Sequence, residues 1–206
     1  MRVRPLLLAL AALTAPLAAQ ATVYQFNAAL SAANELHVSS STATGIASLF
    51  YDDKGTASLA DDTYDFTMSV SGLSGGTLAG TAASAFHIHG AATAAENGPV
   101  RVALDAPPFV FLNAGSFLLV GGFGIAAPSI PATPATATNA GHPAMSFLDM
   151  LTGGLAYVNV HTAAVPAGAT RGQLMQVAVV PEPASYALLL GGLGLVGFVA
   201  GRRRRA

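Results

Sequence analysis

The sequence predicts an all-β domain, an antiparallel β-sandwich or barrel. Short segments alternate apolar and polar residues with a period of two, as half-buried strands do, and glycine-containing turns separate them. No long amphipathic helix pattern appears between residues 22 and 180. Apolar residues make up 52% of the 206 residues and charged residues only 9%. This composition excludes a disordered chain and supplies enough apolar side chains for a buried core.

The clearest strand pattern lies at residues 64–71, where one face is apolar and the other is polar. Similar alternation at 24–30 and at 46–51 predicts two strands before it. Asn97-Gly98-Pro99 is a turn signal between two later strands. The later strands are predicted at residues 85–89, 100–104, 155–162 and 170–179.

The segment between residues 105 and 153 is less regular. Residues 109–123 are apolar and rich in glycine, and they can hold one or two strands. Residues 127–141 are rich in proline, alanine and threonine without an apolar period, so we expect an exposed loop there. A short helix is expected over residues 143–151, with proline in its first turn and Gly153 at its end.

Charge and cysteine content exclude several classes of function. Between residues 22 and 180 only three basic residues face nine acidic ones. The body therefore has no basic surface for nucleic acid, and we exclude that partner. The chain has no cysteine, which excludes disulfides, thiolate zinc sites and cysteine nucleophiles.

Residues 1–21 are typical of a secretory signal peptide. Arg2 and Arg4 precede an apolar run, and the small residues Ala19 and Ala21 suit a cleavage site. A membrane anchor is the alternative, although the run is short for one. We therefore expect an exported β domain over residues 22–180.

The C-terminal residues 181–206 have three parts. The motif Pro181-Glu182-Pro183 comes first, an apolar stretch over 184–201 follows, and a run of arginines comes after it. Eighteen helical residues extend about 27 Å, close to the thickness of a bilayer's hydrocarbon core. The sequence therefore predicts a transmembrane helix at 184–201 whose arginines stay on the cytoplasmic side.

These three parts, in this order, resemble a PEP-CTERM sorting signal. The resemblance implies a Gram-negative bacterium in which an exosortase recognises Pro181-Glu182-Pro183 in an inner-membrane precursor. The exosortase and the secretion machinery are then partners, and the body is sorted to the cell surface or released. An extracellular polysaccharide of a biofilm matrix, or a surface protein, is the further partner implied. A plain C-terminal membrane anchor is the alternative.

Three histidines form a candidate metal site. His87 and His89 are two residues apart on a predicted strand, so both point to the face opposite Phe86 and Ile88. We expect that face to be the outer surface. His161 lies in a second segment with the same alternation, and it can join the pair if the two strands are neighbours. Imidazoles at this spacing can bind one metal ion, or they can be half-buried side chains that hydrogen-bond to loops.

Five pieces of the body occur in a recognisable order: AANE (32–35), STATGIASL (41–49), SVSGLSG (69–75), AFHIHGAATAAENGPV (85–100) and GGLAYVNVHTAAVPAGATRGQL (153–174). Together they resemble a CHRD domain, the module described in chordin. The resemblance implies a β-sandwich, immunoglobulin-like or superoxide-dismutase-like, and it implies no particular reaction. Departures occur at His37-Val38 and over residues 105–141.

The order of the histidine strands is also similar to the copper site of copper/zinc superoxide dismutases. By that analogy His87, His89 and His161 bind copper or zinc, and Arg171 lies beside them. The cysteine pair and the zinc-binding loop of that family are missing here. Without the analogy, two roles for Arg171 stay open. It either pairs with a carboxylate and holds the last strand, or attracts an anion to the site.

No nucleotide-binding or hydrolase motif occurs in the chain. We therefore expect an exported, non-enzymatic module with a structural, adhesive or binding role at the cell surface or in the extracellular matrix. The alternative is a metal-binding protein with histidine ligands, including a copper-dependent oxidoreductase.

Overall fold

The computed structural model describes residues 21–76, 85–181, 191–194 and 201. The expected signal peptide therefore lies almost wholly outside the described residues, and so does most of the expected helix at 184–201. Residues 191–194 and 201 are helical. Among the described residues, no helix is both long and apolar enough to cross a membrane.

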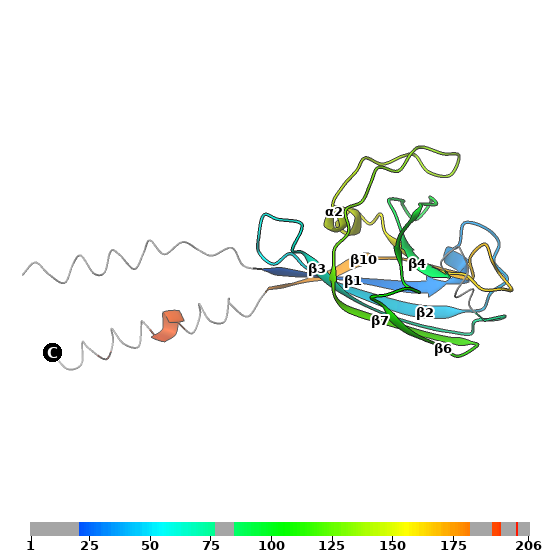
Figure 1. The fold of residues 1–206 in the computed structure, drawn as a ribbon, viewed down its shortest axis with the longest axis horizontal. Helices are drawn as coiled ribbons and strands as arrows, with labels where there is room; N and C mark the ends of the chain where they lie inside the picture. The colour runs from blue at the N-terminus through cyan, green and yellow to red at the C-terminus, as the bar shows by residue number, and fades with distance from the viewer. Residues whose placement is uncertain (1–20, 77–84, 182–190, 195–200, 202–206) are drawn as a thin grey trace, which may run out of the picture.

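The domain is a single curled antiparallel sheet, which confirms the all-β prediction (Figure 1). The strand order is β5-β4-β8-β9-β1-β2-β3-β7-β6, and β10 pairs with β1 outside this path. The strands are β1 (Thr22–Ser31), β2 (Thr44–Asp52), β3 (Thr63–Ser71), β4 (Phe86–His89), β5 (Val100–Ala103), β6 (Val110–Asn113), β7 (Phe117–Ala126), β8 (Tyr157–Val160), β9 (Thr170–Gln173) and β10 (Met175–Pro181). Two short helices are η1 (Ala32–Asn34) and α2 (Phe147–Thr152).

The first three strands follow the predicted alternation. Their register aligns Phe26 with Leu49 and Leu49 with Phe66. Residues directly opposite each other in a sheet point to the same face, and all three of these side chains are fully buried. One face of these three strands thus contributes to the core.

The predicted strand at 170–179 is two strands. Leu174 separates β9 from β10, is fully buried, and its N–H donates to the Ala156 carbonyl. β1 consequently pairs with β10 along most of its length and with β9 at Ser31↔Arg171. Gly172 permits this crossing, since a Cβ there would lie 2.7 Å from the Ala29 carbonyl oxygen.

The helix begins later than the sequence pattern predicts. The Ser146 hydroxyl oxygen accepts a hydrogen bond from the Asp149 N–H and so caps the first turn of α2. The chain before it is extended, because Met145 pairs with Ile130 in an isolated bridge. The expected start at residue 143 is therefore wrong, whereas Gly153 does end the helix.

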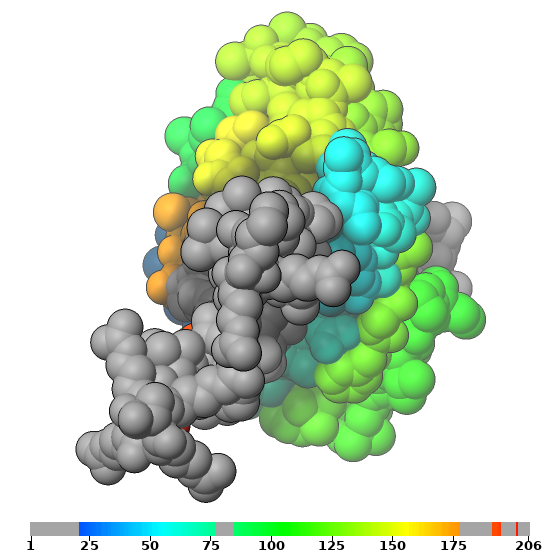
Figure 2. Space-filling view, turned by 90° about the vertical axis from the view of Figure 1, so that its left-hand side faces the viewer, coloured from blue at the N-terminus to red at the C-terminus, as the bar shows by residue number. Residues whose placement is uncertain are grey.

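Residues 109–123 hold parts of the two paired strands β6 and β7. Residues 127–141, expected as an exposed loop, contain most of an irregular hairpin in which three isolated bridges join residues 130–136 to residues 139–145. It is only partly exposed, because Ile130, Thr133 and Asn139 are buried. In Figure 2 this yellow-green segment lies next to the cyan loop before β3, and a cavity of about 700 Å³ is lined by residues of both.

Replacement of Phe66 by alanine should lower the free energy of unfolding by about 3–5 kcal/mol, because it leaves a void in the core. Ser69→Ala, on the opposite face of β3, should cost less than about 0.5 kcal/mol. Urea denaturation measures both values. Equal losses would show that β3 is not buried on one face only.

Candidate metal centre

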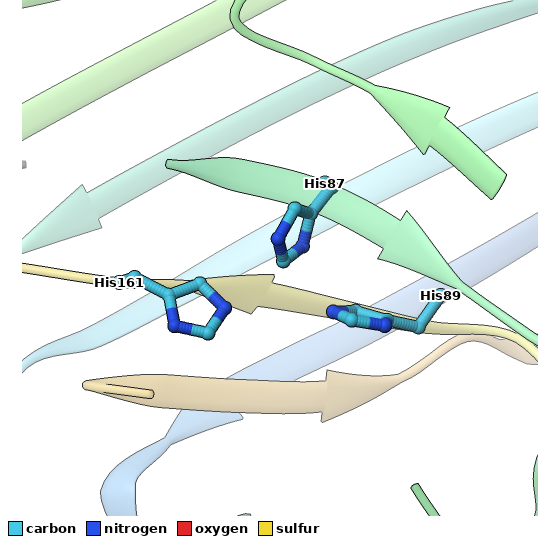
Figure 3. A group of neighbouring side chains, drawn as sticks. All are labelled: His87, His89 and His161. Atoms are coloured by element: carbon cyan, nitrogen blue, oxygen red, sulfur yellow. The ribbon is translucent and has the colours of Figure 1, made fainter. Parts of the chain in front are cut away.

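The structure brings His87, His89 and His161 together (Figure 3). β4 carries the first two, and its antiparallel pairing with β8 sets His87 opposite Asn159. His161 directly follows β8, two residues after Asn159, and therefore lies on the same face beside His87. The ring centroid of His87 lies 4.2 Å from that of His89 and 4.8 Å from that of His161.

The distances between the rings suit one metal ion after a small adjustment. One candidate ligand nitrogen from each ring lies within 4.8 Å of the other two. Two nitrogens bound to one ion at about 2.1 Å can be at most about 4.2 Å apart. Side-chain rotations that shift a nitrogen by less than about 1 Å would therefore bring all three to one ion.

The histidine face is not fully the outer surface that we expected, because His87 is buried while His89 and His161 are half-buried. His87 is 4% exposed, and Phe86 and Ile88 on the opposite face are fully buried as expected. Residues 91–98, which we call the covering loop, fold back over β8 and β9 and bond to Tyr157, Arg171 and Gln173. A strand pattern alone does not show this, because the cover comes from a distant part of the fold.

Backbone carbonyls fix the protonation of two of the rings. The Nδ1 of His89 lies 2.7 Å from the Gly98 carbonyl oxygen, and the Nδ1 of His161 lies 2.9 Å from that of Pro166. A carbonyl oxygen only accepts, so each Nδ1 carries a hydrogen, and in the neutral ring Nε2 then keeps its lone pair. Such bonds are typical of histidines that bind metals. The Nε2 of His89 is buried and has no hydrogen-bond partner among the described residues.

Burial keeps His89 neutral. It lowers the pKa of the imidazole to about 4, against the opposing effect of the hydrogen bond to Gly98. The nearby positive charge of Arg171 also lowers this pKa. The unprotonated ring, which is the form that binds a metal, is therefore the dominant form of the metal-free protein down to about pH 4.

Arg171 lies beside the site, as the analogy implies, but its guanidinium is engaged. The residue is 2% exposed, and its donors bond to Asn97 Oδ1 and to the carbonyls of Thr93 and Glu96. Its guanidinium carbon lies 3.5 Å from the centre of the Tyr157 ring. The Tyr157 ring in turn stacks on His89, with centroids 4.6 Å apart and planes within 7°.

No sequence pattern indicates roles for Tyr157, Gly98 or Glu35. The turn signal at 97–99 indicated where Gly98 lies, but nothing local showed that its carbonyl accepts from His89. The Glu35 side chain is 3% exposed, and burial raises its pKa, opposed by the positive charge of Arg171. It packs against Gly168, where a Cβ would lie 2.7 Å from Oε1 of Glu35.

The other two histidines of the chain lie outside the cluster. His37 has its Nδ1 3.8 Å from the Glu35 carboxylate. His142 has its Nε2 3.1 Å from a carboxylate oxygen of Glu96. Neither joins a group of possible ligands among the described residues.

Glu96 ties the covering loop to the irregular hairpin. Its carboxylate accepts from the N–H groups of Thr93 and Ala140 at 2.8 Å each, and from His142. These bonds lower the pKa of Glu96 to about 2, because they favour the charged form. An ordinary glutamate titrates near 4.3.

Acid should therefore remove a contribution of Glu96 to stability. Between about pH 4.3 and pH 2 the unfolded chain binds a proton that the folded protein does not, so stability falls as the pH falls. The difference in unfolding free energy between the wild type and Glu96→Gln should be largest above pH 5 and should shrink toward pH 2. Urea titrations at several pH values measure it. A difference that stays constant from pH 7 to pH 2 would contradict this account.

Comparison with known families agrees with the architecture. Residues 26–174 match the model of the CHRD domain, and residues 179–205 match that of the PEP-CTERM protein-sorting motif. No curated protein and no solved structure gives a significant match. The sorting motif indicates an exported protein that the secretion machinery and an exosortase process. Since the first match spans well over half of the sequence, the chain belongs to the CHRD domain family.

Proposed function

We propose that this exported CHRD protein binds one transition-metal ion through His87, His89 and His161. The observation that carries the proposal is the convergence of three imidazoles from two paired strands. Two of them present Nε2 lone pairs because backbone carbonyls hold their Nδ1–H groups. Three neutral nitrogen donors suit copper or zinc, which imidazole binds well.

The surroundings of the site favour binding over redox catalysis. In a copper-dependent oxidoreductase, Arg171 would be the residue that attracts an anionic substrate. Here its guanidinium is buried and donates to three acceptors of the covering loop. An anion could reach it only if those hydrogen bonds broke, so metal binding without a reaction is the function that this arrangement supports best.

The mature domain, residues 22–180, would carry the metal outside the cell. In this proposal the signal peptide 1–21 and the sorting segment 181–206 direct a precursor anchored in the inner membrane to the cell surface or the matrix. Thr22 pairs with Pro181, so the two ends of the domain lie at the same end of the sheet (Figure 1). The signal peptide and the sorting segment would therefore both join the domain at that end.

A structural or adhesive role is the second candidate, and one surface favours it. The outer face of β6 and β7 exposes large apolar side chains, with Val110 at 76%, Leu112 at 57% and Phe123 at 73%. Exposed apolar patches on soluble domains often mark contact surfaces. None of these three side chains belongs to the histidine cluster, so a metal site and a contact with a polysaccharide or a surface protein can coexist.

Added Cu²⁺ or Zn²⁺ should raise the melting temperature of the purified protein, because a ligand that binds only the folded state stabilises it. At a hundredfold excess over Kd the gain is about 2.7 kcal/mol. Alanine at His87, His89 or His161 should abolish the rise. His37→Ala is the control and should keep it, since His37 lies outside the cluster.

A different result would support a structural role for the histidines. If neither metal changes the melting temperature, and all three alanine variants still melt earlier, the rings serve only as hydrogen-bond partners. Each loss of such a partner costs about 1–3 kcal/mol. That outcome would contradict the metal proposal.

Deletion of Pro181-Glu182-Pro183 should leave the protein in the inner membrane with its C-terminal segment attached, because the exosortase would no longer recognise it. Fractionation of cells and mass spectrometry of the C-terminus measure both properties. A deleted form that reaches the outside without residues 184–206 would show that another step removes the tail.

A further inference from the structure

We infer that Arg171 is the positioning residue of the histidine site: through the covering loop and Tyr157 it holds the Gly98 carbonyl that sets the tautomer of His89. The effect on the tautomer needs no metal. Only the consequence for affinity rests on the proposed function.

One set of contacts runs from Arg171 directly into the covering loop. The guanidinium donates to the Glu96 carbonyl at 2.9 Å, to the Thr93 carbonyl at 3.1 Å and to Asn97 Oδ1 at 3.3 Å. These acceptors lie within five residues of Gly98 and precede it in the chain. A buried cation with three acceptors on one loop fixes that loop, because moving the loop would leave the charge unpaired.

A second set of contacts runs through Tyr157. Its ring lies between the Arg171 guanidinium and the His89 imidazole, at 3.5 Å and 4.6 Å respectively. Its hydroxyl accepts from the Gly98 N–H at 3.2 Å. The same tyrosine therefore orients the His89 ring and holds the residue whose carbonyl that ring bonds.

Both sets of contacts meet at the 2.7 Å bond between His89 Nδ1 and the Gly98 oxygen. If the carbonyl moves away, the hydrogen on Nδ1 loses its acceptor and the Nε2–H tautomer becomes competitive. In that tautomer the hydrogen occupies the nitrogen that would bind the metal. Arg171 thus acts at a distance on the basicity and direction of one ligand.

Lysine cannot replace arginine in this role. An ammonium group is a single point of positive charge, whereas the guanidinium is planar and presents several N–H donors in fixed directions. The guanidinium carbon of Arg171 also lies over the Tyr157 ring, 3.5 Å from its centre, an arrangement that suits a planar cation. Arg171→Lys keeps the charge and should still lose the position of the loop.

The test measures the His89 tautomer by long-range ¹H–¹⁵N NMR on the full chain in detergent without metal. In the wild type, His89 should be the Nδ1–H tautomer alone. Arg171→Lys should give a mixture with the Nε2–H form. Tyr157→Phe, which removes only the hydroxyl contact with Gly98, should move the tautomer in the same direction by a smaller amount.

Tyr51→Phe is the matched control. It removes another buried tyrosine hydroxyl, which donates to Asp62 at 2.5 Å far from the covering loop. It should destabilise the protein and leave His89 unchanged, so a general loss of stability cannot imitate the predicted result. If Arg171→Lys does not fold, the comparison of Tyr157→Phe with Tyr51→Phe decides the question.

Metal affinity is the second measurement. Loss of a group that orients a ligand typically weakens binding 10–100-fold, and we expect that range for Cu²⁺ or Zn²⁺ in Arg171→Lys. A pure Nδ1–H tautomer in both site variants would overturn the inference, whatever the wild type binds. If the variants show the tautomer change but the wild type binds no metal, the proposed function is contradicted and the role of Arg171 stands.

Discussion

The buried guanidinium of Arg171 is the constraint on which the arrangement of this site depends. A charge at 2% exposure must be paired, and here the partners are acceptors of the covering loop. The loop is therefore held against the sheet, the Gly98 carbonyl meets His89, and the stack of Arg171, Tyr157 and His89 is closed. Two further hydrogen bonds join the same loop to the irregular hairpin. The Asn139 side-chain amide donates to the Asn97 carbonyl, and the Ala140 N–H donates to the Glu96 carboxylate.

Much of the fold could be predicted because the pattern of each strand is local. Residues 64–71 alternate so regularly that their buried and exposed faces follow directly from the sequence, and β3 has those faces. The start of α2 could not be predicted in this way. Residues 143–145 are extended because Met145 pairs with Ile130, and a contact between distant segments overrides the local preference for a first turn at proline.

The candidate site was predictable in its members and less so in its surroundings. The spacing of His87 and His89 fixes a shared face, and alternation places His161 on the corresponding face of its own segment. The sequence does not show that the two strands are neighbours, because the pairing of β4 with β8 depends on the whole sheet. The covering loop was missed for the same reason: acceptors of residues 93–97 approach Arg171 on β9 across more than seventy residues of sequence.

X-ray absorption spectroscopy of the copper- or zinc-loaded protein tests the central claim most directly, because it reports the atoms around the ion. The account predicts three imidazole nitrogens at about 2.0–2.1 Å, with the multiple-scattering signal of their rings. A first shell of oxygen atoms, or a spectrum with at most one imidazole, would show that the ion binds elsewhere and would contradict the assignment of His87, His89 and His161 as its ligands.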